Sequence, residues 1–434
     1  MLTEVKLVAV VDVIKASRSR FALPALITLC VGLLSTGLAQ DAGNYRMAPN
    51  KLDTEIDILA NYYEQDGDFG APQGGLGTEE LSNVAGIVVV QVPLDSNSAV
   101  SATLGADYYS SASTDRIDYQ LSTASAHDLR GYLNIGYTER QLDKGRTYGV
   151  RLGASFEYDY ESINGGLSFA QEWNRGQDEL SFGLQVFNDR WDLIYPLELR
   201  TPGAQFSRLD SRGRQSYGLS IAYARILTPR IQLAVTSEFV AMRGLLSTPF
   251  HRIYFQGSVD PASYVDEARR QFPADDIERL PSERYKLPVS LRANVKIGDN
   301  LSLRTFGRYY ADTWGVRGIS GDVEFAYNFG GAWTVLPYAR YYSQQGADYY
   351  AGFAQHLPGE AFYTSDFDLA TLTTTKIGLG LRYAPLFGIA RTRFANRGFE
   401  WRQLVLRGSY FSRDPGLEAY SVTLSTSMTL RQAK

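Results

Sequence analysis

The chain has 434 residues, a formal net charge of −4 and a single cysteine, Cys30. A mildly acidic sequence without a block of Lys and Arg gives no reason to expect nucleic-acid binding. Cys30 lies in an apolar N-terminal segment, so removal of that segment would exclude disulfides and other thiol chemistry. The high counts of tyrosine, 29, and glycine, 40, are the features of the composition that need an explanation.

Residues 1–39 are predicted to be a secretory signal peptide with a long basic n-region. Two arginines precede an uncharged apolar run over residues 21–34, and small residues lead to an expected cleavage site after Ala39. The alternative is a retained helical anchor, because residues 21–38 carry no charge. The basic start and the small-residue end favour the signal peptide, and therefore export.

The stretch 147–160 alternates with a period of two residues. Every even position from Tyr148 to Tyr160 is apolar or aromatic, and no odd position from Thr147 to Asp159 is apolar. Side chains alternate between the two faces of a strand, so one face of this stretch is apolar and the other is polar. A strand of a soluble protein usually has roughly 5 to 6 residues, and a tilted membrane strand needs about 9 to 11. The length of this stretch therefore fits a membrane strand.

The same alternation predicts an all-β fold, a transmembrane antiparallel β-barrel of about 16 strands, over residues 51–430. A short periplasmic segment, residues 40–50, would precede it, and residues 431–434 would form a C-terminal tail. Closing the sheet pairs every backbone polar group within the lipid core. The predicted strands are 51–64, 81–92, 98–110, 128–140, 147–160, 162–173, 179–191, 215–227, 231–243, 286–297, 301–311, 319–329, 333–343, 371–384, 399–411 and 418–430.

The connections alternate in length, which predicts the orientation of the barrel. Short turns follow most even-numbered strands, and longer segments follow most odd-numbered strands, as expected for periplasmic turns and extracellular loops. The longest segment, 244–285, could enter the lumen as a constriction or lie outside as a lid. Both termini would lie on the periplasmic side of the bacterial outer membrane. Outer-membrane lipid, and the barrel assembly machinery during biogenesis, are the expected partners.

Tyrosine pairs end several of the outward-going strands. The four pairs are Tyr62-Tyr63, Tyr108-Tyr109, Tyr309-Tyr310 and Tyr341-Tyr342. One ring of each pair would face lipid at headgroup depth, in an aromatic girdle, and the other would face the lumen.

Charged residues at inward positions are the candidates for lining the lumen. A barrel of 16 strands is wide enough for an aqueous channel, in which facing charges would bias the passage of solutes. The alternative is a salt-bridge network that stiffens the wall, and the two can coexist. The candidate residues are Arg130, Arg151, Glu157, Asp159, Glu238, Arg292, Arg304, Arg308, Glu324, Arg340 and Arg382.

No catalytic, cofactor or metal site is expected from the sequence. His127, His251 and His356 fall in outer loops or strand ends without a second member of a triad at recognisable spacing, and they are interpreted as isolated surface residues. The oxygen-rich segment 110–118 lacks the acidic spacing of an EF-hand loop. The protein is therefore not expected to be an enzyme, although a lipid-modifying activity is not excluded.

Three segments give a specific resemblance. They read LPSER at 280–284, RYYADTWGV at 308–316 and PYARYYSQQGADYY at 337–350. Together they resemble an uncharacterised family of Gram-negative outer-membrane β-barrel proteins, a porin-like bacterial domain of unknown function. The resemblance implies the barrel, but no substrate or catalytic residue. Many barrels end on an aromatic residue that the assembly machinery reads, and here Leu430 is followed by Arg-Gln-Ala-Lys.

The second and third segments predict a structural motif at the outer rim. Its candidate residues are Tyr310, Asp312, Trp314, Gly315 and Tyr342. Asp312, Trp314 and Gly315 would form a tight external loop that braces the rim.

The leading function predicted from these features is a porin-like channel for small hydrophilic solutes. The alternative is a structural or receptor barrel, occluded by its loops, that serves a periplasmic or surface partner. The fold of segment 244–285 distinguishes them, since an inward fold narrows a pore and an outward fold suggests surface recognition. Neither the solute nor the oligomeric state can be read from the sequence.

Overall fold

The computed structural model describes residues 53–110, 127–199, 212–258, 274–394 and 397–431. The expected signal peptide 1–39, the segment 40–50 and residues 432–434 lie outside the described residues.

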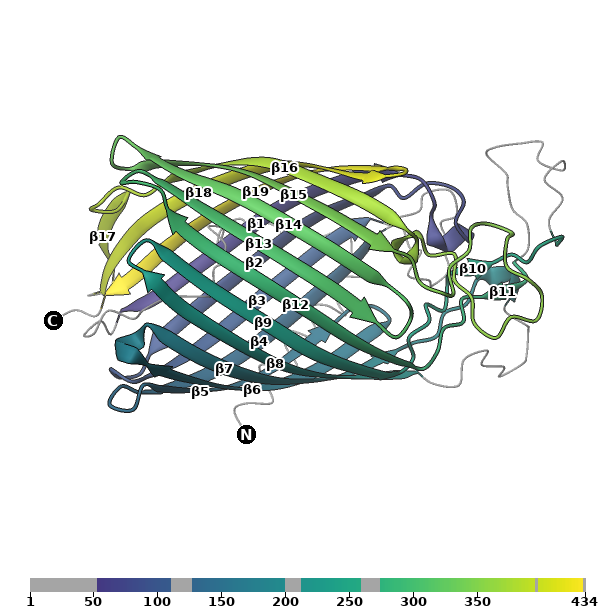
Figure 1. The fold of residues 1–434 in the computed structure, drawn as a ribbon, viewed down its shortest axis with the longest axis horizontal. Helices are drawn as coiled ribbons and strands as arrows, with labels where there is room; N and C mark the ends of the chain where they lie inside the picture. The colour runs from purple at the N-terminus through teal and green to yellow at the C-terminus, as the bar shows by residue number, and fades with distance from the viewer. Residues whose placement is uncertain (1–52, 111–126, 200–211, 259–273, 395–396, 432–434) are drawn as a thin grey trace.

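The described chain forms a closed antiparallel barrel of 16 strands. Each strand pairs with its neighbours in sequence, and the ladder between β1 and β19 closes the sheet (Figure 1). The first nine strands are β1 (Thr54–Gly67), β2 (Leu81–Pro93), β3 (Ser98–Ser110), β4 (His127–Gln141), β5 (Arg146–Phe156), β6 (Tyr160–Trp173), β7 (Asp178–Trp191), β8 (Gly213–Thr228) and β9 (Ile231–Gly244). The others are β12 (Glu283–Lys296), β13 (Leu301–Asp312), β14 (Arg317–Phe329), β15 (Trp333–Gln345), β16 (Leu372–Tyr383), β18 (Arg397–Asp414) and β19 (Leu417–Arg431).

All 16 strands predicted from the alternation are present, and two regions differ from the prediction. The predicted strand 147–160 is too long, because the N–H of Glu157 donates to the carbonyl of Tyr160 at 2.8 Å and closes a tight turn after Phe156. The alternation continues through this turn, so it did not mark the end of the strand. The predicted turn 385–398 contains an extra strand, β17 (Ala390–Phe394), which pairs with the start of β18.

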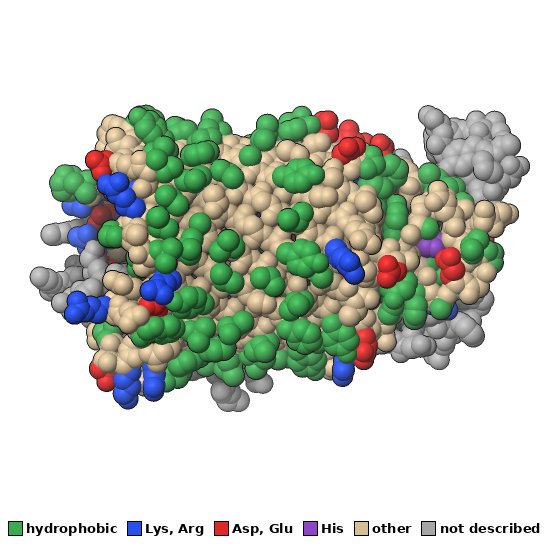
Figure 2. Space-filling view, viewed as in Figure 1, with side chains coloured by type: hydrophobic (Ala, Val, Ile, Leu, Met, Phe, Trp, Pro, Cys, Tyr) green, Lys and Arg blue, Asp and Glu red, His purple; other side chains and the backbone are tan. Residues whose placement is uncertain are grey.

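The outer wall is apolar, as a lipid-facing surface must be. Hydrophobic side chains are distributed over the visible wall in Figure 2, among backbone and other side chains, whereas most charged side chains lie toward the two ends. The tyrosine pairs divide between the faces as predicted. Tyr62, Tyr309 and Tyr341 are among the exposed large side chains, whereas Tyr310 and Tyr342 donate hydrogen bonds on the inner side.

The two ends of the barrel differ as predicted from the connection lengths. The C-terminus, β17 and the short turns lie at one end, and the long loops with β10 (Arg252–Ile253) and β11 (Asp276–Ile277) lie at the other (Figure 1). The described helical segments are 3-10 turns in the connections: η1 (Ala71–Gln73), η2 (Asn174–Gly176), η3 (Leu197–Leu199) and η6 (Phe367–Leu369). None of the helices in the described part of the chain is long and apolar enough to cross a membrane.

Segments from the outer connections pack together into one unit, which we call the cap. It comprises residues 68–80, 192–199, 245–258 with 274–282, and 346–371. The ring of Phe69 stacks on Phe367 at 4.4 Å, and Tyr254 contacts Phe353 at 4.9 Å between ring centroids. The described parts of segment 244–285 therefore lie outside the barrel and contact other loops (Figure 1).

The orientation of the wall predicts unequal costs for the same substitution on adjacent residues. Val235, near the middle of β9, is exposed on the lipid side, and Thr236 lies on the inner side. We expect Val235→Arg to lower the free energy of unfolding by about 2 to 4 kcal/mol, because arginine is costly near the bilayer midplane. Thr236→Arg should cost much less. Equilibrium unfolding in lipid vesicles measures the free energy of unfolding of both variants. An equal loss of stability in the two variants would contradict the assignment of Val235 to the lipid side and Thr236 to the inner side.

Candidate functional site

Charged side chains on the inner wall form ion pairs with one another. Glu324 of β14 accepts hydrogen bonds from Arg304 of β13 at 2.9 Å and from Arg407 of β18 at 2.6 Å. Because β15 and β16 separate β14 from β18, the second contact passes over the inner surface. Arg340 and Asp322 pair through two hydrogen bonds of 2.7 and 2.6 Å. The lumen therefore contains an ion-pair network on this part of its wall.

Most of the predicted lumen residues lie on strands, on the face opposite to the lipid-facing side chains. Arg130 donates to Ser155 at 3.1 Å, and Arg382 donates to Thr334 at 2.9 Å, both on the inner side. The residues so placed are Arg130 on β4, Arg151 on β5, Glu238 on β9, Arg292 on β12, Arg304 and Arg308 on β13, Glu324 on β14, Arg340 on β15 and Arg382 on β16.

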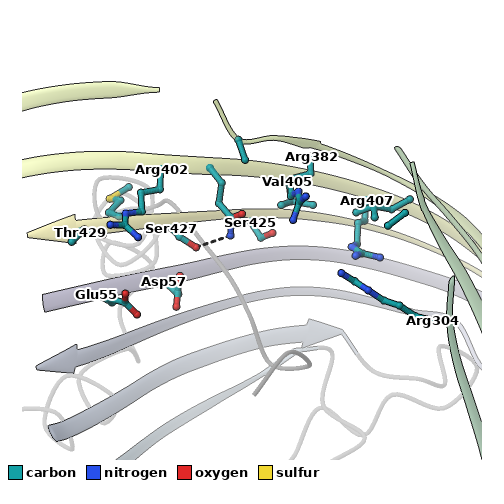
Figure 3. Close-up of a pocket in the computed structure, with 15 residues that line it drawn as sticks. Glu55, Asp57, Arg304, Arg382, Arg402, Val405, Arg407, Ser425, Ser427 and Thr429 are labelled. Carbon is teal, nitrogen blue, oxygen red and sulfur yellow. Dashed lines mark hydrogen bonds between the residues drawn. The ribbon is translucent and has the colours of Figure 1, made fainter. Parts of the chain in front are cut away.

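A cavity of about 380 Å³ lies in the lumen near the strand ends that carry the short turns (Figure 3). Its charged lining consists of Arg304, Arg382, Arg402, Arg407, Glu55 and Asp57. The Nε of Arg402 is buried and makes no hydrogen bond within the described chain. Four arginines face two carboxylates, and Glu324 already pairs with two of the arginines. The charged lining is therefore more basic than acidic.

A β-bulge explains why two arginines of β18 line this cavity together. Arg402 and Arg407 differ in parity, so a regular strand would place them on opposite faces. The register between β18 and β19 shifts between Trp401 and Gln403. The extra residue of this bulge reverses which positions face inward, so that odd-numbered residues after it, such as Arg407, face the lumen. The inward position of Arg407 was missed because a bulge leaves no clear mark in the sequence. Asp322 was also missed, although alternation along its strand could have identified it.

The predicted rim motif forms a compact hydrogen-bonded unit around Asp312. The carboxylate accepts from Arg284 at 2.5 and 2.9 Å and from the Tyr310 hydroxyl at 2.7 Å. It also accepts the backbone N–H groups of Trp314 at 2.9 Å and Val316 at 3.1 Å. The side chain of Asp312 has no exposed surface. This geometry supports the expected bracing of the rim.

Two further features fix the rim loop. The guanidinium of Arg284 lies over the ring of Trp314 at 4.1 Å, and the indole N–H donates to the carbonyl of Glu283. Gly315 has a φ of 88°, and a Cβ there would lie 2.4 Å from a carboxylate oxygen of Asp348. Glycine is therefore required at this position. Tyr342 lies on β15 and donates to Gln344 rather than to Asp312.

Arg252 links cap segments from opposite sides of the barrel mouth. It donates to the carbonyl of Pro72 at 2.7 Å and to Glu198 at 2.7 and 3.2 Å. Pro72 lies in the β1–β2 connection and Arg252 in the β9–β12 connection, which are eight strand positions apart in either direction around the wall. The cap therefore spans the mouth, with only 7% of Arg252 exposed.

Arg413 makes a second buried link, between the end of β18 and two cap segments. It pairs with Glu79 at 2.6 Å and with Asp368 at 3.2 Å, and its guanidinium lies 4.7 Å from the ring centroid of Phe367. Glu79 precedes β2 and Asp368 lies in η6, so one side chain joins three parts of the outer end. Neither Arg252 nor Arg413 was singled out from the sequence, because their partners are distant along the chain.

The interpretation of His251 and His356 as isolated surface residues is wrong. His356 is only 2% exposed and contacts Glu360 and the carbonyl of Thr364 at 3.0 Å. His251 lies 3.4 Å from Glu278, which is 1% exposed. His251, Glu278 and Asp366 bring their ligand atoms within 4.8 Å of one another, and they could hold a metal ion. Burial raises the pKa of Asp366 to about 6, against the opposing effect of His251.

Glu157 and Asp159 lie in the turn after β5 at the outer end, not within the wall strand as predicted. Glu157 accepts from the hydroxyl of Tyr109 at 3.0 Å and lies 3.5 Å from Arg130. Asp159 is 6% exposed. Burial raises the pKa of Asp159 to about 7, with further contributions from the nearby carboxylates of Asp128, Glu157 and Asp192.

Comparisons with known proteins identify one family. The sequence profile of the family described as "Protein of unknown function (DUF3570)" matches residues 25–388. No curated protein matches the sequence.

Several solved structures are similar in fold at low sequence identity. "Bacterial polysaccharide outer membrane secretin" has a TM-score of 0.44 and 12% identity, covering 88% of this chain and 99% of its own. The outer membrane protein opdK from Pseudomonas aeruginosa has a TM-score of 0.37 and 9% identity, covering 87% of this chain and 99% of its own. The siderophore receptor PirA from Pseudomonas aeruginosa has a TM-score of 0.38 and 10% identity, covering 88% of this chain and 81% of its own. The closed sheet and its apolar exterior identify this chain as a β-barrel of the bacterial outer membrane.

The rim geometry predicts that two arginine–carboxylate pairs differ in importance. Asp312→Asn leaves the guanidinium of Arg284, which is largely buried, without its countercharge, and we expect a loss of about 3 to 5 kcal/mol in stability. Asp322→Asn breaks a pair with Arg340 that is partly exposed, and the expected loss is about 1 kcal/mol or less. Equilibrium unfolding in vesicles measures both variants. A stable Asp312→Asn protein with altered transport or binding would contradict the bracing role and place Asp312 in a functional site.

The environment of Asp159 predicts a pH-dependent stability. Its pKa in the folded protein, about 7, lies above the ordinary value of 3.8, so the folded state binds the proton more tightly than the unfolded state. This contribution is present at acidic pH and is lost as the pH rises through 7. We expect Asp159→Asn to stabilise the protein at pH 8 by an amount on the order of 1 to 4 kcal/mol. It should have little effect near pH 4.

Unfolding free energies between pH 4 and pH 8 test this expectation. The control is Asp143→Asn, which changes an exposed carboxylate in the β4–β5 turn. Equal pH profiles for wild type and Asp159→Asn would show that Asp159 does not titrate as its burial requires.

Proposed function

This chain belongs to the DUF3570 family, and we propose that it is a porin-like channel for small hydrophilic solutes. The observation that carries the proposal is the polar inner wall of a 16-stranded barrel with an arginine-rich cavity near its periplasmic end. Barrels of about this strand number are wide enough for an aqueous channel, whereas those of about eight strands are filled by their own side chains.

The cavity supports a preference for anionic solutes. Arg382 and Arg402 add two positive charges to the lining, beyond those of Arg304 and Arg407, which pair with Glu324. Charged side chains that line a pore bias which solutes pass through it. The basic lining would therefore attract carboxylate or phosphate groups and repel small cations.

A second candidate function is a structural or receptor barrel whose mouth is covered by its loops. The observation that favours it is the cap, which crosses the mouth through the contacts of Arg252. An outward-folded loop cluster also presents a surface to an external partner. Under either candidate, outer-membrane lipid contacts the apolar wall and the barrel assembly machinery inserts the protein.

We propose no enzymatic activity. The ring nitrogens of His251 and His356 contact carboxylates and a backbone carbonyl. A hydrolase of the outer membrane would instead need a histidine beside a nucleophilic hydroxyl.

Conductance of the refolded protein in a planar bilayer tests the channel. We expect discrete openings and, in asymmetric KCl, a reversal potential on the anion-selective side. The double variant Arg382→Gln/Arg402→Gln should shift the reversal potential toward cations, because it removes two positive charges from the cavity. The control Arg151→Gln removes an inner-wall charge outside this cavity and should shift it less.

Two outcomes would contradict the proposal. A folded, heat-modifiable barrel that never conducts would exclude an open channel and favour the receptor or structural barrel. A conducting barrel with equal shifts in the double variant and the control would retain the channel and refute the role of the cavity.

A further inference from the structure

Three side chains with metal-binding chemistry converge within the cap, from segments far apart in the sequence. His251 lies just before β10, Glu278 just after β11, and Asp366 at the start of η6. The first two belong to the β9–β12 connection, and Asp366 belongs to the β15–β16 connection. One nitrogen and two carboxylate oxygens lie within 4.8 Å of one another. A ligand bound by all three would add a link between two loops that already pair through the backbone hydrogen bonds of Arg279 and Tyr363.

The distance between His251 and Glu278 fits two ligands of one ion. Nδ1 of His251 lies 3.4 Å from Oε2 of Glu278, beyond the range of about 2.7 to 2.9 Å for a charge-assisted hydrogen bond. In a tetrahedral zinc site with bonds of about 2.0 to 2.2 Å, adjacent ligand atoms are separated by about 3.3 to 3.6 Å. The observed distance falls within that separation.

The local charge is unbalanced without a cation. Glu278 is 1% exposed, and its ion pair among the described residues is with His251. No Lys or Arg in the described part of the chain forms an ion pair with Glu278 or Asp366. One imidazole, even when protonated, neutralises only one of two carboxylates. Buried carboxylates are paired or coordinate metals, and a divalent cation would balance both.

The surrounding hydrogen bonds hold the carboxylates in place for such a role. The N–H of Thr248 donates to Oε1 of Glu278 at 2.6 Å, and the hydroxyl of Thr364 donates to Oε2 at 2.5 Å. The N–H of Asp368 donates to Oδ1 of Asp366 at 3.0 Å, and Oδ2 accepts no hydrogen bond within the described chain. Donors of this kind fix the orientation of metal ligands. Oδ2 of Asp366 remains available.

We propose that His251, Glu278 and Asp366 bind one divalent metal ion of the zinc class, which fastens the cap across the barrel mouth. The imidazole together with two carboxylates selects Zn²⁺ over Mg²⁺ and Ca²⁺, which prefer shells of oxygen alone. Three protein ligands leave a fourth position for water. The ion links the β9–β12 connection to the β15–β16 connection, so it stabilises the arrangement in which Arg252 reaches the opposite side of the mouth.

Zinc titration of the chelator-treated, refolded barrel tests this site. Isothermal titration calorimetry with ZnCl₂ should show one equivalent bound, and MgCl₂ should show none under the same conditions. His251→Gln and Asp366→Asn should each weaken zinc binding by at least about tenfold. The control is Glu360→Gln, which alters a cap carboxylate that pairs with His356 and should retain wild-type affinity.

A second measurement separates a metal ligand from a residue that only supports the loop. Limited proteolysis of the cap should be slowed by zinc in the wild type and in Glu360→Gln, but not in His251→Gln or Asp366→Asn. Heat-modifiable migration on gels establishes that each variant has folded. Absence of stoichiometric zinc binding to the folded wild type, or equal binding by all four proteins, would overturn the proposal. In that case the three side chains form an ion-pair network only.

Discussion

The hydrocarbon core of the membrane offers no partner to a backbone N–H or C=O, and the rest of this structure follows from that constraint. Sixteen strands satisfy it by pairing on both sides, and the β1–β19 ladder removes the last free edges. Once the ladder fixes the register, adjacent side chains must face opposite sides. Lipid selects apolar residues such as Val235 for the outside, and the inner face is free to carry charge. Register thus determines both the apolar surface and the composition of the lumen.

The constraint ends where the strands leave the lipid, and the outer loops must bury their polar groups in another way. Three arginines dominate this end: Arg252, Arg284 and Arg413. Each is largely buried. Arg252 and Arg413 each bind groups from two separate segments, and Arg284 binds the carboxylate of Asp312. Arginine suits this task because its planar guanidinium offers five donors in fixed directions and stays charged. The cap is therefore held by a few directional polar contacts together with small aromatic clusters, unlike the uniform ladder of the wall.

The sequence predicted those parts of the structure that repeat with the period of a strand. The wall, its even strand number and the tyrosine faces depend on local alternation, and the difference between the two ends depends on the lengths of the connections; the 16-stranded wall is confirmed. The rim residues around Asp312 were identified because they are contiguous in the chain. Prediction failed where a local irregularity changed the parity, as at the bulge that turns Arg407 inward, or where alternation continued past a strand end, as at Asp159. It also failed for His251, because Glu278 is 27 residues away in the same connection and Asp366 lies in a different one.

The charged lumen cavity and the cap lie at opposite ends of the barrel and share no residue. Arg402 and its neighbours lie near the strand ends that carry the short turns, whereas Arg252 and Glu278 lie beyond the opposite ends. The wall between them is a continuous hydrogen-bonded ladder, which resists local distortion. In the channel that we propose, the cavity selects the solute and the cap covers the entrance to the lumen, so the two properties belong to separate parts of the protein. The cap depends on a few polar links between loops, whereas the cavity is held by the hydrogen bonds of the strands that line it.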